Sequence, residues 1–562
     1  MTAQRLAMGA CIALALYLAL APLAFLVQQS FQATEGASAA PATLENYRRA
    51  FVDGDAWRLL GNSVAFSAGS AAFAFVIGTT LAWINERTNA PFKRAFFALS
   101  IVPLVIPGVL FAVAWILLAS PRIGIVNLVL QSLLSTDRVF VDIYTLPGMM
   151  FVEGLHQSPI AFLMMTATFR AMDPSLEESA LMSGAGVLRV AWHITLKLCW
   201  PAACAALLVL FVRAIESFEV PAMLGVPAGI EVFTSAIYKA IHQYPGRIGL
   251  ASAYSVLLLG LAAVALAMQA RLSTRGTRHA TVTGRGYRQR PIDLRGWRYA
   301  AGALAIAYLV LIVGLPLLAL VWASFQRYYS VPSLKALSTL SLEPYAGVLA
   351  YPALGQAVVN SAMLAAGAAT IVMAIAAVIG WIVVRSRLPG RVALDGIASL
   401  PIAIPGIVLG LAIMIVYLKL PVGIYGTLWI LLVAYVTRFL PYGLRYASAS
   451  LVQIHRELEE SAAISGASWA VTFRRIVLPL IRPGLVAGWI YVAIVSMREL
   501  STSILLYGPG TEVLPVVVWE LWENGQYTGL SALGVMFIAA LLGMAMLAYR
   551  VGRGFPVVPA PR

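Results

Sequence analysis

The sequence predicts an all-α membrane protein of about twelve transmembrane helices, built as two parallel six-helix repeats. Composition is the first observation: of 562 residues, 60% are hydrophobic and 11% are charged, and the mean hydropathy is +0.85. A soluble globular chain is nearer about half apolar and about a quarter charged. The second observation is that the apolar residues form runs of about 20, the length that crosses a bilayer. The third is an internal repeat.

Twelve apolar runs are the predicted spans. The first six lie near 6–28, 62–84, 95–119, 146–169, 200–221 and 250–270. The other six lie near 298–323, 358–383, 394–418, 424–446, 483–505 and 529–550. The first run follows Arg5 and precedes an Ala-rich stretch at 37–42, a pattern that also fits a cleaved signal peptide. Because the run is longer than a usual signal core and the small residues come well after it, we expect an uncleaved first helix.

Basic residues in the short gaps between spans set the orientation. The chain has 39 Lys and Arg against 24 Asp and Glu, and cations gather at 85–94, 271–297 and 384–393. Cytoplasmic loops hold most of the Arg and Lys of a membrane protein. We therefore expect a multi-pass protein of the bacterial inner membrane with both termini in the cytoplasm. A pI near 9.8 could also suggest nucleic acid, but cations spread among membrane gaps argue against such a partner.

The repeat divides the chain into a first half, 1–270, a basic linker, 271–297, and a second half, 298–562. With an offset of 298, Trp83 falls on Trp381 and Gly108 on Gly406. After a longer outer segment in the first half, around 119–146, the offset becomes 282. Parallel repeats imply a pseudo-two-fold axis along the membrane normal, with a pathway between the halves. The linker is either a solvated connector or a contact for anionic lipid head groups.

One pattern occurs in the gap between spans four and five and again between spans ten and eleven. The first copy reads Glu178-Ser179-Ala180, then Gly184, then Ile194-Thr195-Leu196. The second reads Glu460-Ser461-Ala462, then Gly466, then Ile476-Val477-Leu478-Pro479. Both resemble the EAA loop of ABC importer permeases, with the order E-A-A, three residues, G, nine residues, I-x-L-P. The second copy matches everywhere except Ser461, and the first departs at Lys197, where the family usually has Pro.

The residues around the first copy predict two short helices. Asp173-Pro174-Ser175 followed by Glu178 is typical of a helix start, and Gly184 permits a sharp reversal into a second helix over 186–198. In the family this pair of short helices protrudes into the cytoplasm and docks in a cleft of the ATPase subunit. The alternative is an amphipathic interfacial hairpin. Two copies in register at matching positions favour the docking loop.

The resemblance implies the type I ABC importer permease fold, and it also implies partners. No G-x-x-x-x-G-K-[ST] phosphate loop occurs in the sequence, so ATP and Mg are expected on a separate, homodimeric ATPase, one subunit for each loop. An extracytoplasmic solute-binding protein is expected to deliver the substrate. The chain is thus expected to be a transport subunit and not an enzyme, with no catalytic residue, no cofactor and no metal site. Its three cysteines, Cys11, Cys199 and Cys204, are odd in number and lack metal spacing.

Charged residues inside predicted spans are candidates for the pathway. They are Arg213, Glu216 and Glu219 in span five, and Arg498 and Glu499 in span eleven. Under the offset of 282, Glu216 corresponds to Arg498. Opposite charges at such positions could close the pathway as a gate or form a purely structural ion pair. Arg438, near the inner end of span ten, is expected to snorkel to the interface.

Three stretches are similar to fused ferric-iron importer permeases: Ser120-Pro121-Arg122-Ile123-Gly124, 213–221, and Arg498-Glu499-Leu500-Ser501-Thr502-Ser503. This similarity implies ferric iron as the substrate, although related fused permeases serve thiamine, phosphonates and other small solutes. A different class, the ATP-independent secondary transporter, also has about twelve spans in two parallel halves. It would lack the repeated loop.

Overall fold

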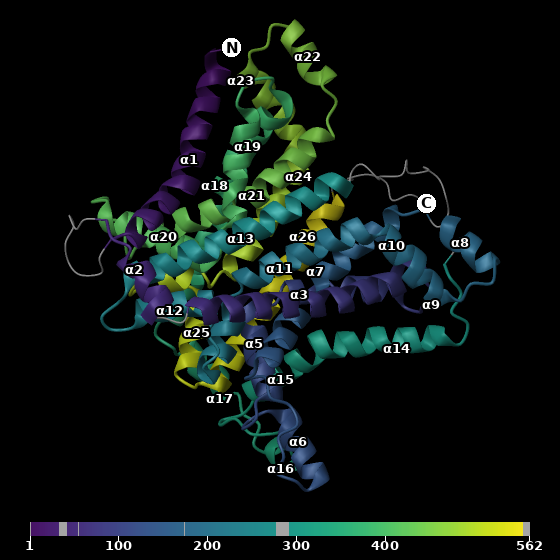
Figure 1. Ribbon diagram of the computed structural model, residues 1–562. Coiled ribbons are helices and arrows are strands. Elements are labelled where there is room, and N and C mark those ends of the chain that lie inside the picture. Colours follow the sequence, from purple (N-terminus) through teal and green to yellow (C-terminus); the bar gives the residue numbers. More distant parts are fainter. Residues whose placement is uncertain (1, 33–41, 54–55, 174, 277–290, 555–562) are drawn as a thin grey trace. The chain divides into compact units, whose positions relative to one another are not determined.

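The computed structural model describes residues 2–32, 42–53, 56–173, 175–276 and 291–554. Within these residues the regular elements are helices, and only two isolated bridges join extended segments (Figure 1). The chain forms two compact units, which are described separately. Unit 1 comprises Met1–Gly54, Ile237–Val256 and Tyr345–Arg562, and unit 2 comprises Asp55–Ala236 and Leu257–Pro344.

Three long helices form the centre of unit 2. They are α3 (Ala56–Arg87), α7 (Leu146–Ala171) and α11 (Trp200–Glu216). Small residues let these helices approach closely, as is common between membrane helices. A Cβ on Gly78 would lie only 2.5 Å from the Cβ of Ala161, and Ala71, Ala74 and Ala161 are almost fully buried.

The equivalent helices of the repeat form the centre of unit 1. They are α18 (Leu354–Arg385), α21 (Leu428–Val452) and α24 (Leu478–Met497). Glycine again marks the close contacts: a Cβ on Gly443 would lie 2.5 Å from Val372 Cγ1, and one on Gly488 would lie 2.8 Å from Met373 Cε. The two units therefore repeat both the helices and the way these helices pack.

Two predicted spans are broken rather than continuous. The span expected at 95–119 is α4 (Lys93–Leu99) with a short turn to Leu104, then α5 (Gly108–Ala119), bent by 101°. The span expected at 394–418 is α19 (Arg391–Ser399) with a turn to Ala403, then α20 (Gly406–Lys419), bent by 107°. Pro107 and Pro405 have extended backbone at these bends. Proline cannot donate the amide hydrogen that would continue a helix, so each bend begins at a Pro-Gly pair.

Every predicted span has a helical counterpart. Among the described residues, seven helices are long and apolar enough to cross a bilayer, and three bent pairs raise the total to ten. The remaining two are α7 and α21, which have 26 and 25 residues. At 1.5 Å per residue each is about 38 Å long and spans the hydrocarbon core, but polar side chains such as Glu153 and Arg438 lower its hydropathy. The all-α membrane fold is confirmed.

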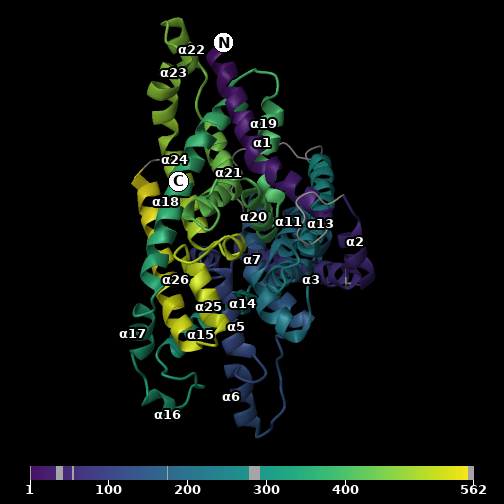
Figure 2. The ribbon, with the colours of Figure 1, turned by 90° about the vertical axis from the view of Figure 1, so that its left-hand side faces the viewer.

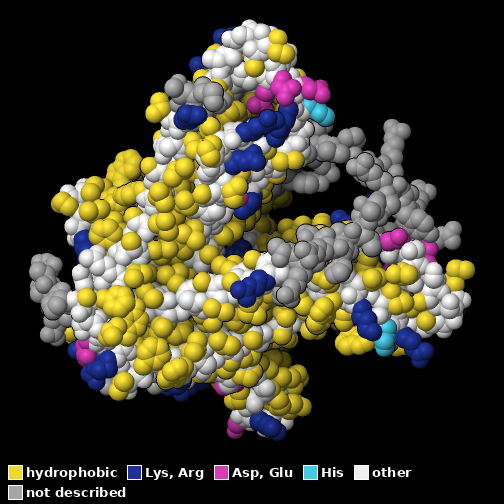
Figure 3. All heavy atoms as spheres, turned by 45° about the horizontal axis from the view of Figure 1, so that its top comes forward, with side chains coloured by type: hydrophobic (Ala, Val, Ile, Leu, Met, Phe, Trp, Pro, Cys, Tyr) yellow, Lys and Arg dark blue, Asp and Glu magenta, His cyan; other side chains and the backbone are white. Residues whose placement is uncertain are grey.

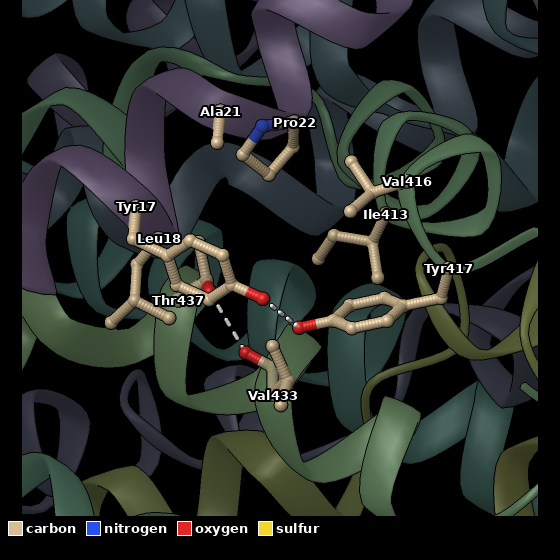
Figure 4. Close-up of a pocket in the computed structure, with 9 residues that line it drawn as sticks. All are labelled: Tyr17, Leu18, Ala21, Pro22, Ile413, Val416, Tyr417, Val433 and Thr437. Carbon is tan, nitrogen blue, oxygen red and sulfur yellow. Dashed lines mark hydrogen bonds between the residues drawn. The ribbon is translucent and has the colours of Figure 1, made fainter. Parts of the chain in front are cut away.

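The helix that opens each sequence half packs on helices of the other half. In unit 1, α1 (Thr2–Ser30) lies along α20, and the hydroxyls of Tyr17 and Tyr417 are 2.6 Å apart (Figures 2 and 4). In unit 2, α14 (Trp297–Leu309) brings the Tyr308 hydroxyl 2.9 Å from Ser158 Oγ, and α15 (Leu315–Ser324) packs on α5. The compact units thus divide the chain differently from the halves 1–270 and 298–562, which describe the repeat.

The remaining helices are short, apart from α13 and α26, which form the last span of each half. They are α2 (Glu45–Arg48), α6 (Ile125–Leu134), α12 (Phe233–His242), α13 (Ile248–Gly276), α16 (Leu334–Leu337), α17 (Glu343–Leu349), α25 (Leu514–Glu523) and α26 (Tyr527–Gly554). Hydrophobic side chains cover most of the face seen in Figure 3, and charged side chains lie in a few small areas. This surface fits helices that face lipid.

The end of the basic linker is fixed to unit 2. Asn89 donates from Nδ2 to Asp293 Oδ1 at 2.5 Å, and Thr88 forms a bridge with Ile292. The backbone N–H of Arg295 and the Asn89 side chain, in that order, hold the pKa of Asp293 below its usual value. Four of the linker cations, Arg278, Arg285, Arg288 and Arg290, lie outside the described residues.

Candidate functional site

The first loop, residues 173–198, begins with the predicted short helix. Helix α8 spans Ser175–Met182, and Asp173 Oδ1 accepts the Ser175 N–H at 2.9 Å. Asp173 therefore caps the start of the helix as predicted; Pro174 lies outside the described residues. The helix ends at Met182, and Gly184, two residues later, has a φ of +85°.

The bonds at Gly184 form a Schellman motif, with Gly184 N–H donating to Leu181 O and Ala185 N–H to Ala180 O, both at 3.0 Å. The second loop, residues 455–480, repeats this geometry. Helix α22 spans Glu457–Ile464, and Gly466, two residues after its end, has a φ of +79°. Two hydrogen bonds at 3.0 Å close the same motif. Figures 1 and 2 both show α22 at the end of unit 1, beyond α24.

The second helix of each loop also forms, but the two copies differ. In the first, residues 187–198 form helical turns, α9 (Val187–Val190), η3 (Ala191–Thr195) and α10 (Leu196–Leu198), and the axis bends by 71° before α11. In the second, α23 (Trp469–Thr472) and η9 (Phe473–Val477) continue into α24 as one span. The bent copy is the one with Lys197 in place of proline, and its Pro201 lies at the start of α11.

The residues predicted for the two loops lie on α8 and α22 or within two residues of their ends. Ser179, Gly184, Glu460, Ser461 and Gly466 are exposed, Glu178 and Ala180 are half-buried, and Ala462 is buried. Two further residues stand out that sequence reasoning missed. Met182 is 89% exposed and Ile464 is 88% exposed. They correspond under the offset of 282, and each lies two residues before the reversing glycine. An apolar residue at both of these positions was the available signal.

A buried ion pair also connects each loop helix to a span of its own unit. In unit 2, Arg87 is the last residue of α3 and Glu177 lies in the first turn of α8. Arg87 Nη1 lies 3.6 Å from Glu177 Oε2, and each side chain is only 3% exposed. Arg87 also donates from Nη2 to Met172 O at 3.1 Å, just beyond α7, and Thr195 Oγ1 donates to Glu177. We call this set, Arg87, Glu177 and Thr195, the first loop anchor.

Unit 1 has the equivalent pair. Arg385 ends α18, and its Nε lies 3.1 Å from Glu459 Oε1 in the first turn of α22. Trp381 donates from Nε1 to Glu459 Oε2 at 2.9 Å. Arg385 donates from Nη2 to the carbonyl of Leu451 in the last turn of α21, at 2.7 Å, and to that of Ile454 just beyond the helix, at 2.5 Å. Arg385, Glu459 and Trp381 form the second loop anchor.

The anchors join the same three helices in both units. Carbonyls at a helix C-terminus lack partners within the helix, and a carboxylate is favoured at a helix N-terminus. In each unit one arginine donates to a carbonyl at or just beyond the end of a span and pairs with the carboxylate in the first turn of the loop helix. Removing one partner of a buried pair typically costs about 3–5 kcal/mol because the other charge stays buried. From the sequence alone, both arginines are only cations of the predicted cytoplasmic gaps. Arg87 and Arg385 are equivalent under the offset of 298, and Glu177 and Glu459 are equivalent under the offset of 282. This repetition was the signal by which the pairs could have been found.

The five pathway residues do not all lie inside helices. Arg213 and Glu216 are in the last turn of α11, as expected, but Glu219 lies beyond its end. Arg498 and Glu499 likewise follow α24, which ends at Met497. The predicted continuous spans 200–221 and 483–505 are therefore wrong at these ends. Non-helical backbone at membrane depth is tolerated where it is buried in protein or lines a cavity.

Glu499 explains the break in unit 1. Its Oε1 accepts the N–H and the hydroxyl of Thr502, both at 3.0 Å, so the carboxylate replaces backbone carbonyls at the start of the next turn. Its Oε2 lies 3.0 Å from Arg438 Nε. The expectation that Arg438 snorkels to the interface is wrong, because α21 extends to Val452 and places Arg438 near its middle, 18% exposed at the side chain and paired.

A second intramembrane carboxylate lies in unit 2, and sequence reasoning missed it. Glu153 in α7 accepts hydrogen bonds from Ser217 Oγ at 2.8 Å and Gln157 Nε2 at 2.6 Å, and it is 4% exposed. Under the offset of 282, Ser217 corresponds to Glu499. Both units thus hold a carboxylate at the break after this span. Glu216 belongs to unit 2 and Arg498 to unit 1, so their pairing stays a prediction.

Residues 74–278 and 373–555 each match the family described as binding-protein-dependent transport system inner membrane component. The two matches fall one in each half of the repeat and together cover more than half of the chain. The chain belongs to this family. It is therefore a multi-pass inner-membrane permease of a binding-protein-dependent transport system. The family match also agrees with the EAA resemblance of the two loops.

Curated relatives of this permease extend over most of its length. It is 26% identical over 505 residues to the ferric transport system permease protein FbpB of Actinobacillus pleuropneumoniae, covering 87% of this chain and 70% of the relative. It is 23% identical over 485 residues to the Fe(3+)-transport system permease protein FbpB 2 of Haemophilus influenzae, covering 85% and 87%. A solved bacterial ABC transporter involved in import of alginate matches with TM-score 0.38 and 18% identity, over 46% of this chain and 95% of that chain.

Proposed function

We propose that this permease forms the pathway of an ABC importer for ferric iron, and that its two loops each dock on one subunit of a homodimeric ATPase. The observation that carries the docking is the pair Met182 and Ile464. Single exposed apolar residues are ordinary on protein surfaces. Here, however, each lies at the end of a protruding helix, at equivalent positions and with 89% and 88% exposure. Such a repeated apolar tip fits a repeated partner.

The ATPase supplies the chemistry in this proposal. ATP and Mg bind to the partner, because the sequence of this chain has no phosphate loop. The loops then face the cytoplasm, and the positive-inside pattern places both chain termini there as well. A solute-binding protein on the opposite side delivers the cargo, in keeping with the family.

Ferric iron is the favoured cargo because relatives that match over most of this chain are ferric transport permeases. The direct test is to measure the thermal stability of the binding protein that works with this permease in the presence of each candidate solute. Ferric iron should raise its melting temperature, whereas thiamine and a phosphonate should not. Stabilisation by either of these solutes, and not by ferric iron, would contradict the cargo.

The pathway charges complete the proposal. Glu216 and Arg498 are proposed to pair as a gate, with Arg213, Glu219 and Glu499 close to them in sequence. The variant Arg498→Glu places two like charges at the gate, so transport should be blocked or uncoupled from ATP hydrolysis. Normal uptake at a normal protein level would contradict the gate.

Docking is tested by charge at the loop tips. The double variant Met182→Asp and Ile464→Asp puts carboxylates into an apolar contact, so the ATPase should no longer copurify with the permease. The control is Leu334→Asp, because Leu334 is also 89% exposed but lies in the gap between spans seven and eight, on the side opposite to the predicted loops. The control should retain the ATPase. Full copurification with the double variant would contradict docking by these loops.

A further inference from the structure

The two loop anchors connect each protruding loop helix to spans of its own unit. The first joins the last residue of α3, the carbonyl that follows α7 and the first turn of α8. The second joins the last residue of α18, one carbonyl in the last turn of α21 with another just beyond it, and the first turn of α22. Both arginines are at the final helical position, and both glutamates immediately precede the Glu of the repeated pattern.

Burial separates these pairs from surface ion pairs. The side chains of Arg87 and Glu177 are each 3% exposed, and those of Arg385 and Glu459 are 7% and 15% exposed. In contrast, Arg170 is 55% exposed where it pairs with Glu86, and Arg445 is 63% exposed where it lies 4.0 Å from Asp395. Exposed pairs hold two elements weakly because water competes for both charges. A buried pair with further hydrogen bonds fixes the distance between the elements that it joins.

A comparison of the two loop anchors shows which of their contacts are the same in both units. The additional partner of the glutamate differs, since Thr195 donates to Glu177 whereas Trp381 donates to Glu459. Trp83, the equivalent of Trp381, has no hydrogen-bond partner for its Nε1 among the described residues. The arginine, the glutamate and the carbonyl contact recur in both units.

We propose that the Arg87–Glu177 and Arg385–Glu459 pairs are the positioning contacts through which movement of α8 and α22 is passed to the spans. This inference rests on the proposed docking of the loops on an ATPase. The charge pair makes the loop helix and the ends of two spans move together, so displacement of the loop displaces the spans. Without the pair, the loop still presents its apolar tip to the ATPase but moves independently of the spans.

The test uses the full complex of permease, ATPase and binding protein in lipid vesicles. In the double variant Glu177→Gln and Glu459→Gln, the ATPase should copurify as with the wild type, while the ATP hydrolysed per cargo molecule transported should rise about tenfold, within the usual range of coupling between sites. Glu86→Gln is the matched control: it breaks an ion pair between α3 and α7 that does not include α8. Its ratio should equal that of the wild type.

A spectroscopic measurement reports the connection itself. Spin labels at Ser175→Cys and Phe92→Cys, both exposed, in a chain whose three native cysteines are replaced by alanine, report the distance between α8 and the chain just after α3. This distance distribution should stay narrow in the wild type with and without ATP, and should broaden with Glu177→Gln but not with Glu86→Gln.

The outcomes separate the inference from the function on which it rests. A wild-type ratio together with a narrow distance distribution in the glutamine variants would overturn the inference while docking stands. Failure of the wild-type permease to bind the ATPase would overturn the proposed function and the inference with it. If the glutamine variant does not assemble, Arg87→Met with Glu177→Met removes both charges and keeps the volume, a change that folded proteins often tolerate. This variant should assemble and show the raised ratio, and a normal ratio would overturn the inference.

Discussion

Trp83 and Trp381 occupy equivalent positions in the repeat, but only Trp381 donates from its indole nitrogen to a carboxylate, that of Glu459 at 2.9 Å. Comparing variants of these two residues therefore measures how much the Trp381 hydrogen bond stabilises the second loop anchor. The sequence predicted that the two tryptophans are equivalent. It could not predict the difference, because the partner lies 78 residues away along the chain.

We expect Trp381→Phe to destabilise the chain more than Trp83→Phe. Both changes remove the same atoms, but only the first removes a hydrogen bond to a charged group, which contributes about 1.5–3 kcal/mol. The melting temperature of the purified permease should therefore fall further with Trp381→Phe. Equal melting temperatures for the two variants would show that the hydrogen bond contributes little.

The glycines at the two bends give a second comparison at the same scale. A Cβ on Gly406 would lie 2.5 Å from Arg438 Nη1 and 2.9 Å from Ser501 Cβ. A Cβ on Gly108 would meet Glu219 Cδ at 3.5 Å, an ordinary contact. Gly406→Ala should therefore displace Arg438 from Glu499 and lower the transport rate of the assembled complex, while Gly108→Ala should not. Wild-type transport with Gly406→Ala would mean that the pair does not need its observed geometry.

The loop helices are the elements that sequence predicted best. The Asp173 cap, the short helix, the reversal at Gly184 and the following helical turns all form where the residue pattern indicated, because capping and glycine chemistry are local. The bends at Pro107-Gly108 and Pro405-Gly406 were missed, although the residues were aligned. Hydropathy shows only that a run is apolar, and it does not show that the run turns. The ends of α11 and α24 were missed for the same reason.

The Schellman motifs give the prediction that belongs to this scale. Replacing Gly184 and Gly466 by Ala forces a side chain into a left-handed backbone, which costs about 1–2 kcal/mol at each position. Nothing lies within 4 Å of either Cβ position, so the cost is one of conformation rather than of space. Amide hydrogen exchange in α8 and α22 should rise several-fold. Gly186→Ala, at a neighbouring open position without positive φ, is the control, and an equal rise there would contradict the explanation.

For the whole molecule, the sequence predicted the all-α fold, the repeat and the family, because each leaves a pattern along the chain. It did not predict that α1 and α14 each pack with the other half. That exchange depends on contacts such as Tyr17 with Tyr417, 400 residues apart. The loop anchors were missed on the same ground: Arg87 and Glu177 meet only because α3, α7 and α8 converge. Repeat offsets align residues in the two halves, but they do not show which residues touch.

The central claim is that this permease imports its cargo through two loops coupled to a separate ATPase. Reconstitution of the permease with the ATPase in vesicles tests it most directly, with ATP supplied on the loop side and iron-loaded binding protein on the other. We predict uptake of ferric iron that requires both, and that stops in the double variant Met182→Asp and Ile464→Asp. Uptake by the permease alone, driven by an ion gradient without ATPase or ATP, would place the protein among secondary transporters and contradict the claim.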